Sequence, residues 1–170
     1  DYAFVIAGFL DLYEASGEPR WLEEALRLDA VLEKHYEDPA GGFFLTSDDH
    51  EQLLAREKPS YDGAEPSANS VQAMNLLRLH ELTTSDRFRA RADRLFVAFG
   101  GGLGSRPAAL SEMLLAVDFR LDTTKEIVIV TPGQRSAATP FLDELRRAFL
   151  PNRVLIVASA TDSRGPHEKL

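Results

Sequence analysis

The feature that most constrains the fold is an internal repeat at an offset of 67 residues. Between residues 10–28 and 77–95, seven of nineteen positions are identical, and Trp21 lies opposite Phe88. The identical pairs are Leu10 and Leu77, Leu12 and Leu79, Glu14 and Glu81, Arg20 and Arg87, Ala25 and Ala92, Arg27 and Arg94, and Leu28 and Leu95. Each copy has the pattern of a buried helix, a short turn and an amphipathic helix. Such units stack on one another, so the repeat predicts antiparallel helix hairpins in an α/α solenoid or, where a ring closes, an α/α toroid.

Local signals set the expected limits of the first hairpin. Residues 1–16 are apolar on nearly all sides, which predicts an interior helix with Val5 and Leu12 covered as well. Gly17 is suited to end this helix, because glycine adopts the left-handed conformation that closes many helices. Pro19 is suited to open the next helix, where its missing N–H costs nothing.

The second half of the helical region is predicted in the same way. Ser67 is a good N-cap, because its hydroxyl can accept a hydrogen bond from a backbone N–H in the first turn. A further helix is predicted over residues 107–119, with Leu110, Leu114 and Val117 facing inward.

The hydrophobic pattern changes after Lys125. Residues 127–130 and 154–157 are continuous β-branched or aliphatic runs, and a helical stripe lies between them. This order predicts a parallel β-α-β segment whose strands need cover on both faces.

The whole chain is therefore predicted to be mainly α. We expect a helical-hairpin region at 1–124, a β-α-β segment packed on it at 125–158, and a polar tail at 159–170. The first residues already have the pattern of a helix, so we expect the chain to be a fragment of a longer protein.

Charge and composition exclude several partners. The 170 residues carry a net charge of −8, which repels phosphate backbones and anionic lipids, so neither nucleic acid nor membrane partners are expected. No cysteine is present, which removes thiol catalysis and thiolate metal sites. A cytoplasmic location is the default expectation.

The best candidate for chemistry is the loop that precedes the third helix. Asp62 and Glu65 are candidate catalytic acid and base, since glycosidic chemistry needs two carboxyl groups about 5 to 9 Å apart. Arg56 and Asn69 could bind sugar hydroxyls, and Tyr61 could stack on a sugar ring. The same residues fit an architectural role, in which Asp62 makes a turn, Asn69 satisfies helix-start amides and Glu65 is solvated.

The remaining candidates are weaker. His80 is the best of the four histidines for substrate binding, but no histidine lies in a spacing typical of metal ligands, so no metal site is predicted. Residues 131–133 follow a strand and precede a helix, a place that can bind anions. No cofactor is predicted.

Several short motifs resemble one family. They are Asp1-Tyr2-Ala3-Phe4, Leu12-Tyr13-Glu14-Ala15, Gly41-Gly42-Phe43-Phe44, Lys58-Pro59, Tyr61-Asp62-Gly63-Ala64, Pro66-Ser67-Ala68-Asn69-Ser70, Glu126-Ile127-Val128-Ile129 and Phe149-Leu150-Pro151-Asn152. In this order they resemble the YyaL-type, thioredoxin-domain-containing family related to spermatogenesis-associated proteins. The resemblance implies an N-terminal thioredoxin-like domain elsewhere in the full chain. It also implies a helical region similar to six-hairpin glycosidases and N-acylglucosamine 2-epimerases. Ala68 stands where the family has glycine, which weakens the transfer of function at that loop.

Two functions follow from this reading. One is a carbohydrate-active α/α toroid, epimerase-like or glycoside-hydrolase-like, with a sugar as its ligand. The alternative is a non-catalytic helical scaffold or protein-binding module, in which the loop is only architecture.

Overall fold

The structure is a computed structural model that describes residues 1–49 and 55–160. Its elements, in chain order, are α1 (Tyr2–Ser16), α2 (Pro19–His35), α3 (Ala68–Thr83), α4 (Asp86–Ser105), the 3-10 turn η1 (Pro107–Leu110), α5 (Ser111–Leu121), β1 (Lys125–Thr131), the 3-10 turn η2 (Arg135–Ala138), α6 (Thr139–Arg147) and β2 (Arg153–Ser159). The prediction of a mainly helical chain with a β-α-β segment is confirmed. Ser159 ends β2, and the rest of the predicted tail, 161–170, lies outside the described residues.

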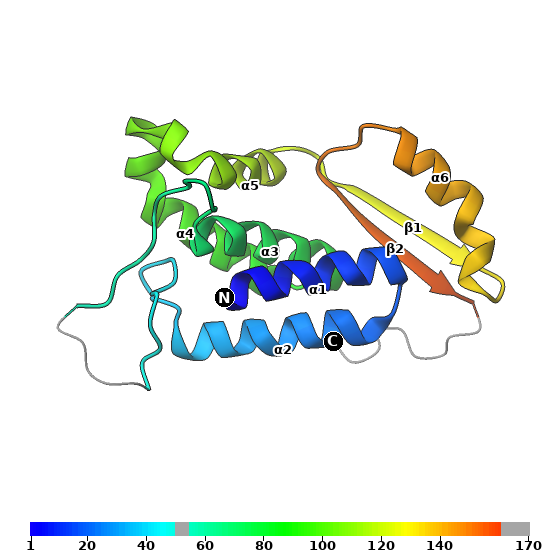
Figure 1. Ribbon diagram of the computed structural model, residues 1–170, viewed down its shortest axis with the longest axis horizontal. Helices are drawn as coiled ribbons and strands as arrows, with labels where there is room; N and C mark the ends of the chain where they lie inside the picture. The colour runs from blue at the N-terminus through cyan, green and yellow to red at the C-terminus, as the bar shows by residue number, and fades with distance from the viewer. Residues whose placement is uncertain (50–54, 161–170) are drawn as a thin grey trace.

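The helices form a row with a second layer behind it. Helix α3 packs between α1 and α5, while α2 covers α1 and α4 covers α3 (Figure 1). The two members of each pair run in opposite directions, so α1 with α2 and α3 with α4 are antiparallel hairpins. One continuous hydrophobic core joins helices α1 to α5, with Ile6, Leu22, Leu77, Leu95 and Met113 among its fully covered side chains.

The repeat is visible in the atoms of the two hairpin turns. Gly17 ends α1 with φ of 70° and Thr84 ends α3 with φ of 58°, and these positions are 67 residues apart. The Ser16 hydroxyl donates to the Leu12 carbonyl at 2.6 Å, and the Thr83 hydroxyl donates to the Leu79 carbonyl at the same distance. The two helix pairs therefore share one turn geometry, although different residues build it.

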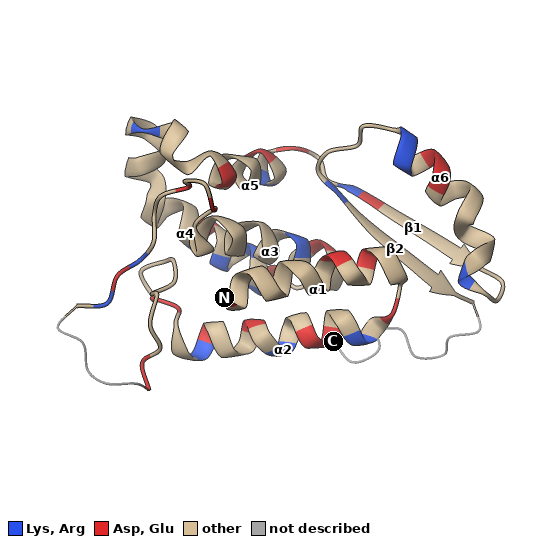
Figure 2. Cartoon of the chain, viewed as in Figure 1, with Lys and Arg blue, Asp and Glu red and all other residues tan. Residues whose placement is uncertain are grey.

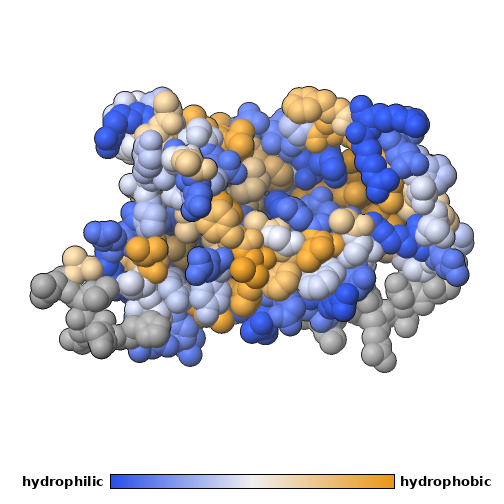
Figure 3. All heavy atoms as spheres, viewed as in Figure 1, coloured by the Kyte–Doolittle hydropathy of each residue, from blue (hydrophilic) through white to orange (hydrophobic). Residues whose placement is uncertain are grey.

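The inner helices are covered less completely than their sequence predicts. Phe4, Val5 and Leu12 of α1 are 44%, 45% and 43% exposed, so cover on several sides is wrong for this face. Figure 3 shows hydrophobic side chains along α1 on the face turned to the viewer. Helices α2 and α3 and strand β2 make the main contacts with α1, and a pattern of apolar residues does not reveal how many neighbours a helix has.

Helix α5 differs in a similar way. Its buried residues are Met113, Ala116 and Phe119, while Leu114 is 37% exposed. The predicted helix over 107–119 divides into η1 and α5 at Leu110. Leu110 is buried as predicted, but the inward face then continues in steps of three residues, so Leu114 is turned away from the core.

The two strands pair in parallel, as predicted, with Ile127 beside Leu155. Strand β2 is covered on both faces, because Val154 joins the helical core and Leu155 packs beneath α6. Strand β1 is covered on one face only, and Val128 is 56% exposed. The expectation of cover on both faces therefore holds for β2 and is wrong for β1, which lies farther from the helices (Figure 1).

A buried polar network crosses the helical core. Asp29 of α2 accepts hydrogen bonds from Arg91 of α4 at 2.6 Å and from Gln72 of α3 at 2.8 Å. Asn75 donates to the Gln72 side chain at 3.0 Å and to the Ala3 carbonyl at 2.8 Å. These bonds link the four helices of the two hairpins. Among the described residues, no helix is long and apolar enough to cross a bilayer.

Candidate functional site

The carboxylate of Asp62 lies where the N-terminal ends of α3 and α5 meet. Its Oδ1 accepts a hydrogen bond from the Ser67 N–H at 2.7 Å. Its Oδ2 accepts from the Ser70 hydroxyl at 3.0 Å, the Glu112 N–H at 3.0 Å and the Met113 N–H at 3.2 Å. Asp62 is only 7% exposed. One buried carboxylate thus satisfies amides of the first turns of two helices, where N–H groups lack partners within the helix.

At the start of α3 a second side-chain oxygen accepts a hydrogen bond from a backbone N–H. The Ser67 hydroxyl accepts from the Ser70 N–H at 3.1 Å, so the predicted N-cap is confirmed. The Asp62 N–H donates to the Ala109 carbonyl at 2.8 Å. The loop is therefore attached to η1 through its backbone as well as to α5 through its side chain.

Asn69 is fully buried, and its side-chain amide forms hydrogen bonds with backbone groups as another peptide group would. Its side-chain oxygen accepts from the Phe43 N–H at 2.7 Å. Its side-chain nitrogen donates to the Phe43 carbonyl at 3.0 Å and the Pro59 carbonyl at 2.9 Å. The amide has one remaining acceptor site, and the protein itself occupies both donors.

Arg56 is also committed to the protein. Its guanidinium donates to the Thr46 carbonyl at 3.1 Å and to the His35 carbonyl at 3.0 Å, and it stacks 4.2 Å from the centre of the Phe44 ring. Stacking and carbonyl contacts of this kind hold two loop segments together.

Lys58 fastens the loop to the glycine pair that follows α2. Its ammonium donates to the Gly41 carbonyl at 2.8 Å and pairs with Asp38 at 2.6 Å. The hydrogen bond from Lys58 to Asp38, together with one from the Ala40 N–H, lowers the pKa of Asp38. Gly41 has φ of 105° and approaches the Arg94 carbonyl so closely that a Cβ would clash, which explains why glycine is needed in that motif.

Tyr61 and Glu65 remain accessible. Tyr61 is 69% exposed, and its ring lies against Gly63. Glu65 is exposed, and its carboxylate makes no hydrogen bond or ion pair with a described residue. The predicted site residues of this loop therefore divide into groups that are bound by other parts of the chain (Arg56, Asp62 and Asn69) and surface groups that are free to meet a ligand (Tyr61 and Glu65).

His80 is not brought to the other candidates. It lies in the last turn of α3, eleven residues beyond Asn69, which is roughly 16 Å along the helix axis. Its Nδ1 lies 3.1 Å from the Ser85 carbonyl, in the turn before α4. The structure thus gives His80 a place in the hairpin turn and separates it from Asp62.

One cluster was not predicted from the sequence. His35 Nδ1 lies 2.8 Å from Asp48 Oδ1 and 3.8 Å from Asp49 Oδ2. The ligand-type atoms of these three residues lie within 4.8 Å of one another. Thirteen residues separate His35 from Asp48, so no local spacing signals the contact. The contact between His35 and Asp48 attaches the segment around Asp48 to the end of α2.

Of the two cavities beside the loop, an open cleft of about 330 Å³ has Lys58 and Ser60 in its wall, and the cavity lined by aromatic rings is small. It has a volume of about 50 Å³ and is lined mainly by Tyr2, Tyr36, Phe43, Phe44 and Gln72, with Pro59 and Ala68 from the loop at its edge. Sites for drug-sized ligands are usually about 300 Å³ or larger. The aromatic lining is of the kind that stacks on sugars, but the volume is too small for a sugar ring.

The fold and this loop define a class: a module of helical hairpins with a parallel β-α-β unit, fastened by a buried carboxylate. The chain is 43% identical over 165 residues to spermatogenesis-associated protein 20 of Rattus norvegicus, covering 96% of this chain and 21% of that protein. It is 42% identical over 165 residues to spermatogenesis-associated protein 20 of Homo sapiens, again covering 96% and 21%. An uncharacterized protein of Caenorhabditis elegans, B0495.5, is 29% identical over 172 residues, covering 99% of this chain and 24% of that protein.

The chain thus spans about one fifth of the length of the curated relatives it matches. This share is consistent with one helical domain of a larger protein. No protein-family model matches the chain.

Proposed function

We propose that this chain is a non-catalytic helical module of a larger protein related to spermatogenesis-associated protein 20, and that the loop at 56–70 is an architectural bracket. The observation that carries the proposal is the state of Asp62. Its two oxygens accept four hydrogen bonds from within the chain, which matches the roughly four acceptor sites that an ionised carboxylate offers. A general acid or base must exchange a proton with its substrate, whereas Asp62 is only 7% exposed and its Oδ2 already accepts three of these hydrogen bonds.

The exposed face of α1 indicates where another part of the larger protein packs on the module. Phe4, Val5 and Leu12 form an apolar stripe on an inner helix, and such a stripe in a helical array is covered by the adjoining helices. We assign that cover to the remainder of the larger protein, since the chain spans only 21% of its rat relative. On this proposal the hairpins are part of an α/α toroid, and the resemblance of the motifs adds a thioredoxin-like domain to the same protein.

A second candidate function is carbohydrate binding at the surface of the same loop. Tyr61 and Glu65 favour it, because an exposed aromatic ring and a free carboxylate lie four residues apart. Asp62, Asn69 and Arg56 would then support the loop without touching the sugar, and Glu65 alone would act as acid or base.

A ligand screen of the full-length protein separates the two. Mono- and disaccharides, their N-acetylated forms and uronic acids are tested by thermal shift on wild type, Glu65→Gln and Tyr61→Ala. The proposal predicts no shift with any sugar. A sugar at about a hundred times its dissociation constant stabilises by about 2.7 kcal/mol, which raises the melting temperature by roughly 5 °C or more for a domain of about 150 to 250 residues and by less for a larger unit. A shift of that size that disappears in Glu65→Gln establishes the carbohydrate function instead.

A further inference from the structure

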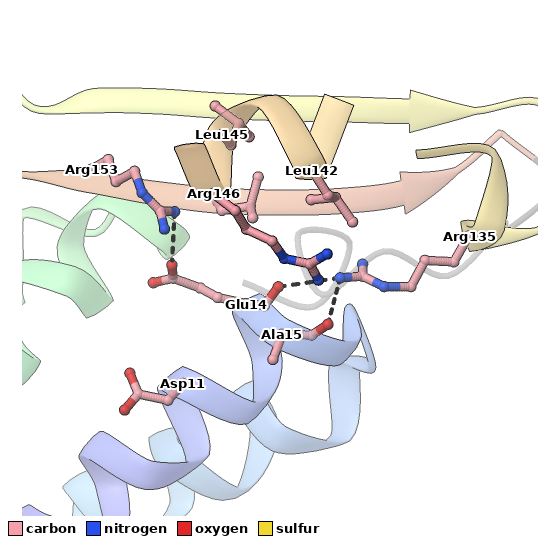
Figure 4. Close-up of a pocket in the computed structure, with 9 residues that line it drawn as sticks. Asp11, Glu14, Ala15, Arg135, Leu142, Leu145, Arg146 and Arg153 are labelled. Carbon is pink, nitrogen blue, oxygen red and sulfur yellow. Dashed lines mark hydrogen bonds and ion pairs between the residues drawn. The ribbon is translucent and has the colours of Figure 1, made fainter. Parts of the chain in front are cut away.

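A cleft lies between the C-terminal end of α1 and the β-α-β unit, away from the loop bracket. It has a volume of about 290 Å³. Three arginines from three elements line it: Arg135 from η2, Arg146 from α6 and Arg153 from the start of β2. Figure 4 shows the guanidinium groups of Arg135 and Arg146 converging above the end of α1, with Arg153 directed at Glu14.

The acidic side chains of the cleft are already paired elsewhere. Asp11 and Glu14 lie on α1 and bind Arg78 of α3 at 2.9 Å and 2.8 Å. Glu14 is also 3.6 Å from Arg153, beyond hydrogen-bond distance. Asp143 pairs with Arg146 at 2.8 Å on the surface of α6. Counting Arg78, four arginines meet three carboxylates here, a positive excess in a chain whose net charge is −8. Figure 2 shows Lys and Arg positions at the starts of the two strands and on α6.

Two of these arginines have unsatisfied donors. Four buried side-chain atoms in the described part of the chain have no hydrogen-bond partner, and Arg135 Nη1 and Arg153 Nη1 are two of them. Among the residues that the structure describes, Arg135 meets no carboxylate and donates only to the Glu14 and Ala15 carbonyls, at 3.3 Å and 2.7 Å. Buried polar atoms are nearly always partnered in folded proteins, so the guanidinium groups of Arg135 and Arg153 are incompletely satisfied beside the cleft.

The electrostatic setting points the same way. Burial and the nearby charge of Arg146 lower the pKa of Arg135, which shows that the like charges are poorly compensated. Leu142, Leu145 and Leu155 form the opposite wall and reduce the screening by water. An anion in the cleft would relieve the repulsion between Arg135 and Arg146.

We propose that this cleft binds a small phosphorylated ligand. Guanidinium groups match phosphate oxygens in forked pairs. Three of them approaching from three elements suit a tetrahedral dianion, which presents oxygens in several directions, better than a planar carboxylate. The volume is close to the lower limit of about 300 Å³ for small-molecule sites, so it holds a phosphate group with a short organic part. This inference is independent of the role proposed for the loop.

The test is isothermal titration calorimetry of the full-length protein with inorganic phosphate and with glucose 6-phosphate, at an ionic strength held constant with chloride. Arg146→Gln removes one donor from an arginine whose side chain is 71% exposed, so folding is preserved. Arg147→Gln is the matched control, because Arg147 follows on the same helix, pairs with Glu144 in the same spacing and does not line the cleft.

We expect phosphate to bind and Arg146→Gln to weaken binding by about tenfold or more, the effect of losing one charge-assisted hydrogen bond. Arg147→Gln should leave the affinity within about twofold of wild type. Tighter binding of glucose 6-phosphate than of inorganic phosphate identifies an esterified ligand, and equal binding identifies free phosphate. The proposal is overturned if neither probe binds, if acetate binds as tightly as phosphate, or if Arg147→Gln weakens binding as much as Arg146→Gln.

Discussion

Arg91 of α4 donates to Asp29 of α2 at 2.6 Å, and both side chains are almost completely buried, at 3% and 0% exposed. The pair connects the outer helix of the first hairpin to the outer helix of the second. A buried ion pair is costly to desolvate and costlier to break, because the remaining charge loses its partner. Asp29 and Arg91 therefore define how the two repeats align.

Removing one member of this pair should destabilise the protein strongly. We expect Arg91→Met to lower the free energy of unfolding by about 3 to 5 kcal/mol in urea titrations, and the double variant Asp29→Leu with Arg91→Met to recover most of the loss. Arg27→Met is the control, since Arg27 makes a surface pair with Glu24 at 2.6 Å, and its unfolding midpoint should match that of wild type. Additive losses in the double variant would show that the two side chains act independently.

The two equivalent hairpin turns should respond in opposite directions to changes at Gly17 and Thr84. A Cβ on Gly17 would clash with Arg135 Nη1 and lie 2.9 Å from the Val157 carbonyl, so Gly17→Ala should cost about 1 to 2 kcal/mol or more. Thr84 has φ of 58°, which strains a β-branched residue, so Thr84→Gly should be neutral or stabilise by up to about 1 kcal/mol. Thermal unfolding of both variants measures this. Equal losses of stability in the two variants would show that the dihedral angles do not predict the strain at these turns.

Glu81 should make stability depend on pH. Burial and the neighbouring Glu126 carboxylate raise the pKa of Glu81 above its ordinary value, despite the opposing charge of His80. A raised pKa means that the folded state holds its proton more tightly, so stability is full below the unfolded pKa and is lost as the pH rises through the folded pKa. Glu81→Gln should therefore stabilise at pH 7 by a few tenths of a kcal/mol, since the group is only partly buried, and by nothing below about pH 4.

Urea unfolding at pH 4 and pH 7 checks this difference. Glu23→Gln on the exposed side of α2 is the control and should show no pH-dependent gain. If Glu81→Gln raises the free energy of unfolding equally at the two pH values, the charge of Glu81 is not the cause of the gain.

The sequence predicted those parts of the fold that depend on neighbouring residues. Gly17, Pro19 and Ser67 mark helix ends through their own backbone and side-chain chemistry, and α1 ends, α2 begins and α3 begins where these signals place them. The strands of the β-α-β segment follow from their β-branched runs in the same way.

The parts that could not be predicted depend on contacts between distant residues. Asp62 meets Glu112 and Met113 at separations of 50 and 51 residues, and nothing near Asp62 in the chain signals those donors. Arg135 reaches Ala15 across 120 residues. Loop composition therefore suggested a site at 56–70, but the partners that decide whether its carboxylates are free became visible only in the fold.

The most direct test of the bracket compares the free energy of unfolding of Asp62→Ala with that of Glu65→Ala in urea. Because Asp62→Ala leaves buried donors at the starts of α3 and α5 without partners, we predict a loss of at least about 3 kcal/mol, with faster hydrogen exchange at the Glu112 and Met113 amides. Glu65→Ala should change stability by less than about 0.5 kcal/mol, because its side chain is exposed. Wild-type stability in Asp62→Ala, together with loss of sugar binding, would contradict the bracket and make Asp62 a functional residue.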